Sequence, residues 1–247
     1  MTDSELLRRR HRLMGGATLF YDSPLHIVRG EGVYLYDHEG RQYVDMYNNV
    51  PCVGHANPQV VAAIEKQMST LNVHSRYLHG GILDFAERLL SYHHAGLEQV
   101  VFACSGTEAS EIALLMARHG TGGQGIVCSD ATYHGNSTEV DKMSSQPVTD
   151  PNFRSIPFPQ TYRPLAEGLD STDLARLYLG KLQEAIDDFA ENNIPFAGLF
   201  FCSIFANEGL PDIPQGFMAQ AVELVHKAGG VVIADEVQAG YCRSGNW

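Results

Sequence analysis

From about residue 100 onward, short apolar segments alternate with amphipathic segments, and no other feature limits the possible folds as strongly. The apolar segments are residues 100–104, 125–130, 197–205 and 231–236. Apolar side chains recur at helical spacing in residues 109–120, 171–193 and 215–230. Because strands that alternate with helices form parallel sheets covered on both faces, the pattern predicts an α/β fold with a mostly parallel, doubly covered sheet.

The chain before residue 100 has a different pattern. After a short N-terminal helix, residues 25–49 alternate apolar and polar side chains around glycine turns, which predicts a small antiparallel meander. Residues 57–71 are predicted to form a helix, because Asn57 suits the N-cap and Pro58 the first helical position. A second amphipathic helix is predicted at residues 82–94.

The domain organisation is expected to follow this change of pattern. We expect residues 1–56 to be an N-terminal segment that belongs to a small domain, and residues 57–247 to be an incomplete large domain. Residues 143–170 are rich in proline and serine, and we expect them to form a long excursion over the surface of the large domain.

Composition excludes several classes of protein. A net charge of −12 gives no basic surface for general nucleic-acid binding. No apolar run approaches the ~20 residues that a membrane helix needs. The N-terminus has no apolar segment of the kind found in secretory signals, and the five cysteines are scattered without C-x-x-C pairing. We therefore expect a cytoplasmic protein with reduced thiols.

Polar residues follow four of the predicted strands, and in parallel sheets functional groups gather at the carboxyl ends of strands. After residues 100–104, Gly106 and Thr107 begin a helix whose N–H groups could bind a phosphate. The alternative is an ordinary helix start, with Ser105 or Thr107 as N-cap and Glu108 completing a capping box.

The other three strand ends carry an aromatic residue or a carboxylate. Tyr133 and His134 follow the strand at 125–130, where an exposed tyrosine could stack on a flat ring or pack on the surface. Glu208 and Asp235 each emerge from a buried strand. A phosphate cradle, a stacking aromatic and a carboxylate for a pyridine nitrogen are together the requirements of pyridoxal phosphate.

The motifs SGTEASEIALLMAR, TYHGNS and VVIADEVQAGYCRSG resemble those of the class III, fold-type I pyridoxal-phosphate aminotransferases. LNVHSRYLHGGILDFAERLL and MYNNVPCVGHANPQVV are similar to the subgroup that includes alanine–glyoxylate aminotransferase 2 and the ethanolamine-phosphate phospho-lyases. The resemblance extends over essentially the whole chain. It implies a transaminase that transfers an amino group from an amine or amino acid to a 2-oxo acid.

The resemblance also implies a role for each matching residue. The cofactor phosphate would be bound by Gly106 and Thr107, and the ring would lie between Tyr133, with His134 beside it, and Val237. Asp235 would pair with the pyridine nitrogen and Gln238 would reach the ring hydroxyl. Glu208 would lie near the reacting centre. Residues implied at the substrate entrance and the interface of a homodimer are Asn49, Val50, Arg76 and Tyr77.

The resemblance further implies a lysine that forms a Schiff base with the cofactor, one strand after Asp235. The chain has four lysines, and none follows Asp235. We therefore expect a truncated chain, a fragment that lacks the catalytic lysine and is inactive alone. Two alternatives remain open: a phospho-lyase acting on a phosphorylated amino alcohol, and a non-catalytic remnant that only dimerises or binds cofactor. No metal site is expected, because the eleven histidines form no metal-binding motif.

Overall fold

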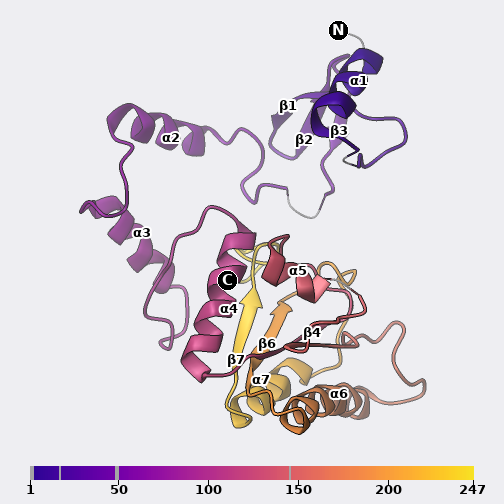
Figure 1. The fold of residues 1–247 in the computed structure, drawn as a ribbon. Helices are drawn as coiled ribbons and strands as arrows, with labels where there is room; N and C mark the ends of the chain where they lie inside the picture. Colours follow the sequence, from indigo (N-terminus) through magenta and orange to yellow (C-terminus); the bar gives the residue numbers. More distant parts are fainter. Residues whose placement is uncertain (1–2, 17, 48–49, 145) are drawn as a thin grey trace. The chain divides into compact units, whose positions relative to one another are not determined.

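The computed structural model describes residues 3–16, 18–47, 50–144 and 146–247 (Figure 1). The chain divides into two compact units, Met1–His79 and Gly80–Trp247, and each is described by itself. The domain boundary expected between residues 56 and 57 stays a prediction. Among the described residues, none of the helices combines the length and the apolar character needed to cross a membrane.

The first unit contains the predicted helix and meander. Helix α1 covers Asp3–Met14. It is followed by the antiparallel strands β1 (Ile27–Glu31), β2 (Tyr34–Asp37) and β3 (Gln42–Val44), in the order β1-β2-β3. Helix α2 spans Pro58–Thr70, and the Asn57 side chain accepts hydrogen bonds from the N–H groups of Gln59 and Val60. The meander and the Asn57 cap are therefore confirmed.

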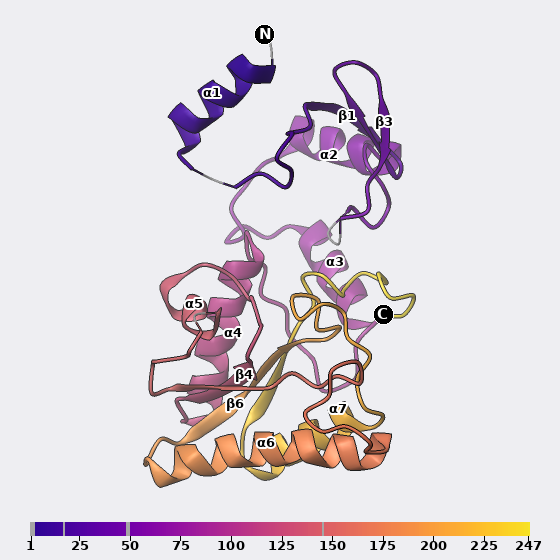
Figure 2. The same ribbon diagram turned by 90° about the vertical axis from the view of Figure 1, so that its right-hand side faces the viewer.

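The second unit contains a parallel sheet of four strands in the order β5-β4-β6-β7. The strands are β4 (Gly125–Ser129), β5 (Phe153–Ile156), β6 (Phe196–Cys202) and β7 (Val231–Asp235). The helices are α3 (Gly80–Leu90), α4 (Gly106–Thr121), α5 (Thr138–Ser144), α6 (Ser171–Glu191) and α7 (Phe217–Lys227). Helices α4 and α5 lie against one face of the sheet, and α6 and α7 cover the other (Figures 1 and 2). The predicted doubly covered parallel sheet is confirmed.

Two hydrophobic cores, one on each face, hold this sheet together. Successive side chains of a strand point to opposite faces, so Ile126 and Cys128 of β4 pack with Leu114 of α4 in one core. Val127, between them, packs with Tyr178 of α6 in the other. All three β4 side chains are fully buried, which explains why this strand is a continuous apolar run in the sequence.

Two predictions about this unit are wrong. Residues 100–104 are not a strand, and Val101 and Phe102 are exposed. A strand needs a partner for its backbone hydrogen bonds, and no strand in the described part of the chain pairs with this segment. Conversely, the expected surface excursion at 143–170 contains β5, which pairs with β4 and buries Phe153 and Ile156. Four residues among prolines are too short a signal to reveal a strand.

Candidate cofactor-binding site

A hollow of about 190 Å³ lies in the second unit, where β6 and β7 end and α4 begins. Its lining consists of Gly106, Thr107, Tyr133, His134, Gly135, Cys202, Asn207, Asp235, Val237 and Gln238. All seven residues predicted to bind the cofactor are among them. The structure thus brings four separate segments of the chain to one place, and the binding roles of these residues stay predictions.

The start of α4 combines two capping hydrogen bonds with backbone N–H groups that have no acceptor within the helix. The Ser105 hydroxyl accepts from the N–H of Glu108 at 3.1 Å, and the Glu108 carboxylate accepts from the N–H of Cys104 at 2.6 Å. The pair is a variant of the capping box considered as the alternative to a phosphate site, because the second bond comes from Cys104, one residue before the N-cap Ser105. It leaves the N–H groups of Gly106 and Thr107 at the first turn, where a helix has no internal acceptor for them. The capping hydrogen bonds are thus compatible with a phosphate site at these two N–H groups, and phosphate binding stays a prediction.

Glycines keep the hollow open beside these donors. A Cβ atom on Gly135 would lie 2.6 Å from Thr107 Oγ1, and one on Gly106 would lie 2.7 Å from a methyl carbon of Val237. Gly135 also has a φ of +139°, which side chains rarely allow. Only glycine fits at Gly135, so the space around the Thr107 hydroxyl depends on it.

Asp235 is held in place by two hydrogen bonds. His134 Nδ1 lies 2.7 Å from Asp235 Oδ2, and the N–H of Val237 donates to Asp235 Oδ1 at 2.9 Å. The other ring nitrogen of His134 lies 2.6 Å from the Thr132 hydroxyl. Because an ionised carboxylate only accepts, His134 Nδ1 donates to Asp235, and the Thr132 hydroxyl holds the other side of the ring. The imidazole is buried against Phe200, with ring centroids 4.2 Å apart.

Asn207 is a lining residue that sequence reasoning missed. Its amide nitrogen donates to the Tyr133 carbonyl oxygen at 3.0 Å, and its amide oxygen accepts from Gln238 at 3.4 Å. The side chain thus joins the ends of β4, β6 and β7. Its position two residues beyond the predicted strand 197–205 was the only signal for it. Tyr133 itself is half exposed, as a stacking residue must be.

Glu208 is the one predicted catalytic carboxylate that does not line the hollow. It accepts a hydrogen bond from the Ser129 hydroxyl, and its Oε2 atom is buried without a hydrogen-bond partner. Burial raises the pKa of Glu208 above the ordinary value, although the Ser129 bond opposes the shift. Its expected place near the reacting centre stays a prediction.

Cys202 is the thiol that lines the hollow. Burial raises the pKa of Cys202 above its ordinary value, which disfavours the thiolate, the form that reacts. Cys128, further along the same edge of the sheet, has a pKa raised by burial to about 12.

The predicted entrance residues lie in the first unit. Val50, Arg76 and Tyr77 are described there, and Tyr77 is exposed. Asn49 lies outside the described residues. The roles of all four at the substrate entrance and the dimer interface stay predictions.

No lysine lines the hollow. Lys142 pairs with Glu139 and Asp150, Lys181 with Glu184, and Lys227 with Glu223. Lys66 is an exposed residue of α2 in the first unit. Within the described residues, the site therefore offers non-covalent contacts only.

Comparison with known proteins gives concordant matches. The family model of class-III aminotransferases matches residues 20–247. An alanine–glyoxylate aminotransferase 2 homolog from Arabidopsis thaliana, named as mitochondrial, is 35% identical over 99% of this chain and 52% of its own length. The chain thus spans about half the length of this curated relative.

Two solved structures extend the comparison. An Arthrobacter phospholyase in complex with phosphoethanolamine matches with a TM-score of 0.90 and 38% identity, over 98% of this chain and 58% of its own. A taurine:2-oxoglutarate aminotransferase from Bifidobacterium kashiwanohense, in complex with pyridoxal phosphate and glutamate, matches with a TM-score of 0.85 and 25% identity. That match covers 100% of this chain and 58% of the aminotransferase.

Proposed function

The chain belongs to the class III aminotransferase family, and we propose that it binds pyridoxal phosphate as part of an enzyme that moves an amino group from an amine or amino acid to a 2-oxo acid. Members of the family are enzymes that use pyridoxal phosphate. The single observation that carries the proposal is the meeting of Thr107, Tyr133 and Asp235 around one hollow.

The residues present fit this cofactor. The free N–H groups of Gly106 and Thr107, in a cradle that a side chain at Gly135 would fill, suit a phosphate. Tyr133 and Val237 offer surfaces for the two faces of a ring. When bound, pyridoxal phosphate supplies an electron sink for the substrate carbon.

In this proposal Asp235 interacts with the pyridine nitrogen of the cofactor, and His134 orients Asp235. A carboxylate at the pyridine nitrogen favours the protonated ring, because the charged pair is stabilised where water is partly excluded. His134 donates to Asp235 and so fixes the direction in which the carboxylate points. Thr132 in turn fixes the ring of His134. Asn207 orients Gln238, the residue expected to meet the ring hydroxyl.

The covalent step needs a lysine, and we propose that it lies outside residues 1–247. Two observations support this. The lysines of the second unit are paired with carboxylates elsewhere, and the Arabidopsis relative is about twice as long as the matched region. Residues 1–247 would then supply the side chains that bind the cofactor, and the remainder of a longer protein would supply the reactive amine.

A second candidate reaction is elimination of phosphate from a phosphorylated amino alcohol. The observation that favours it is the Arthrobacter phospholyase, which is 38% identical to this chain while the taurine aminotransferase is 25% identical. The residues of the hollow are compatible with both reactions, because their proposed contacts are to the cofactor and not to the substrate.

A full-length protein that contains this chain separates the two reactions. Loaded with pyridoxal phosphate, it is given alanine plus glyoxylate in one assay and phosphoethanolamine in another. Formation of pyruvate and glycine supports amino-group transfer, and release of inorganic phosphate supports elimination. Absence of both activities, with cofactor bound, would favour a non-catalytic remnant.

Homodimer formation and a cytoplasmic location are further parts of the proposal. Light scattering on the full-length protein tests the first, with twice the chain mass expected. Fractionation of the source cells tests the second.

A further inference from the structure

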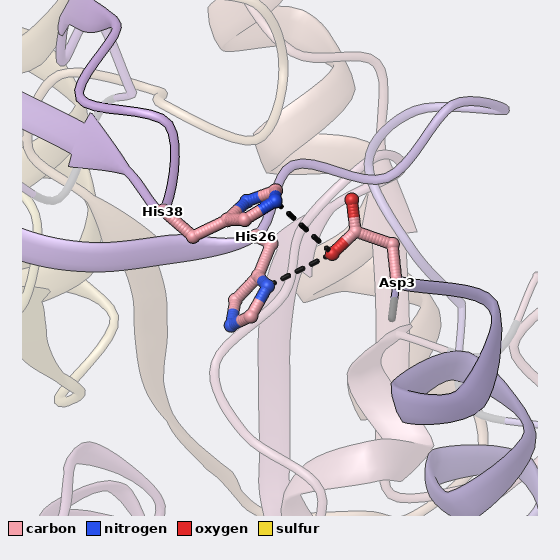
Figure 3. A group of neighbouring side chains, drawn as sticks. All are labelled: Asp3, His26 and His38. Carbon is pink, nitrogen blue, oxygen red and sulfur yellow. Dashed lines mark hydrogen bonds and ion pairs between the residues drawn. The ribbon is translucent and has the colours of Figure 1, made fainter. Parts of the chain in front are cut away.

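Three side chains of the first unit converge on one point. Asp3 opens α1, His26 immediately precedes β1, and His38 immediately follows β2. His26 Nδ1 lies 2.9 Å from Asp3 Oδ1, and His38 Nε2 lies 3.9 Å from the same oxygen. Figure 3 shows both imidazoles directed at this carboxylate oxygen.

The local fold holds the two histidines together. The N–H of His38 donates to the carbonyl oxygen of His26 at 3.1 Å, next to the pairing of Ile27 with Asp37. The two rings are stacked, with centroids 4.7 Å apart and planes inclined by 26°. The meander therefore presents a pair of imidazoles, and α1 adds the carboxylate.

A hydrogen bond explains only part of this arrangement. It accounts for the contact of His26 with Asp3, but 3.9 Å is beyond the reach of a hydrogen bond between His38 and Asp3. Two ligands of a tetrahedral zinc ion, each about 2.0–2.1 Å from the metal, lie about 3.3 Å apart. The distances from Asp3 Oδ1 to His26 Nδ1, 2.9 Å, and to His38 Nε2, 3.9 Å, fall on either side of this value. The three ligand atoms all lie within 4.8 Å of one another.

We propose that Asp3, His26 and His38 bind one divalent transition-metal ion of the zinc type. Two imidazoles and a carboxylate suit zinc, cobalt or nickel, whereas calcium and magnesium prefer oxygen ligands alone. Small rotations of the partly exposed side chains close the remaining gaps.

The site has room for a further ligand. Asp3 and His26 also line a hollow of about 350 Å³ beside α1. Three protein ligands with an open fourth position leave a place for water or a small molecule on the ion. The ion would also tie α1 to the β1–β2 hairpin. No sequence motif reveals this site, because its residues lie 23 and 12 positions apart.

The test uses the tag-free 247-residue chain with its exposed thiols alkylated, so that cysteines cannot bind the metal. Zinc binding is measured by equilibrium dialysis for the wild type, His26→Gln, His38→Gln and the control His226→Gln, an exposed histidine of α7. Cobalt is then added to each protein, and its visible absorption reports the coordination geometry.

We expect one zinc ion per chain for the wild type and His226→Gln, and binding at least tenfold weaker for His26→Gln and His38→Gln. The cobalt spectrum should be tetrahedral and should be lost in the same two variants. His38 is exposed, so its replacement leaves the fold intact, which circular dichroism verifies. Zinc binding that is absent from the wild type, or unchanged in His38→Gln, would overturn the proposal.

Discussion

His134 Nδ1 lies 2.7 Å from Asp235 Oδ2, although the two residues are 101 positions apart. The bond links the loop after β4 to the end of β7. The buried His134 therefore holds the Asp235 carboxylate in place at the centre of the proposed cofactor site.

The first prediction concerns this bond. His134→Phe keeps a ring against Phe200 but removes the donor to Asp235, whereas His134→Asn can place an amide N–H near the position of Nδ1. A hydrogen bond to a charged group contributes about 1.5–3 kcal/mol. We expect the phenylalanine variant to bind pyridoxamine phosphate about 10- to 100-fold more weakly, and the asparagine variant to retain part of the affinity. Fluorescence titration measures both; equal losses in the two variants would contradict the role of the bond.

The second prediction concerns the space around Thr107. Gly135→Ala puts a methyl group 2.6 Å from the Thr107 hydroxyl oxygen at a backbone φ of +139°. We expect weaker cofactor binding together with a loss of stability of about 1–3 kcal/mol. Gly120→Ala, in α4 where nothing lies within 4 Å of the new methyl, is the matched control. It should raise stability by up to about 1 kcal/mol and leave binding unchanged. Urea unfolding and the same titration compare the two.

The third prediction concerns the pH dependence of stability. Because burial raises the pKa of Glu208, the folded state favours the protonated carboxyl. The wild type therefore loses stability as pH rises from the ordinary value of 4.5 through the raised pKa. Glu208→Gln keeps the acceptor for Ser129 but has no charge, so its stability relative to the wild type should rise with pH. Unfolding curves at pH 5 and pH 8 measure this, and a difference that is the same at both would refute it.

The fourth prediction concerns a charged cluster that joins α4, α5 and the turn before β5. Glu139 accepts from Arg118 and from Lys142 at 2.7 Å each, and Lys142 also pairs with Asp150 at 2.9 Å. Glu139→Gln should lower the free energy of unfolding by about 1–3 kcal/mol, because the half-buried Arg118 loses a charged partner.

The contribution of Glu139 should disappear in acid. Burial raises its pKa, but the bonds from Lys142 and Arg118 outweigh this and leave the pKa below 4.5. Its stabilisation is therefore present above pH 4.5 and lost as pH falls through the lowered pKa. Glu184→Gln, which breaks the exposed pair with Lys181, serves as control and should change stability by less than about 1 kcal/mol. A cost for Glu139→Gln that persists in strong acid would contradict the ionic origin.

The sequence was sufficient where a signal is local. The Asn57 cap, the glycine turns of the meander and the fully buried β4 each leave a pattern within a few residues. The strand at 100–104 was predicted wrongly because an apolar run does not show whether a partner strand exists.

The parts of the site that could not be predicted from the sequence depend on contacts between residues far apart in the chain. The ends of β4, β6 and β7 could be predicted to meet, since parallel strands end at the same edge of a sheet. The bond of His134 to Asp235 could not, and neither could the place of Asn207 between Tyr133 and Gln238. Such pairs are set by how the segments pack, which the spacing of residues along the chain does not record.

The central claim is that the hollow formed by Gly106, Thr107, Tyr133 and Asp235 binds the cofactor. Pyridoxamine phosphate tests it most directly, because this form has no aldehyde and so cannot react with surface lysines. Equilibrium dialysis of the 247-residue chain should show one bound molecule, with affinity at least tenfold lower in Asp235→Ala and unchanged in Gly120→Ala. Failure of the folded wild-type chain to bind pyridoxamine phosphate, or equal binding by Asp235→Ala, would contradict the claim.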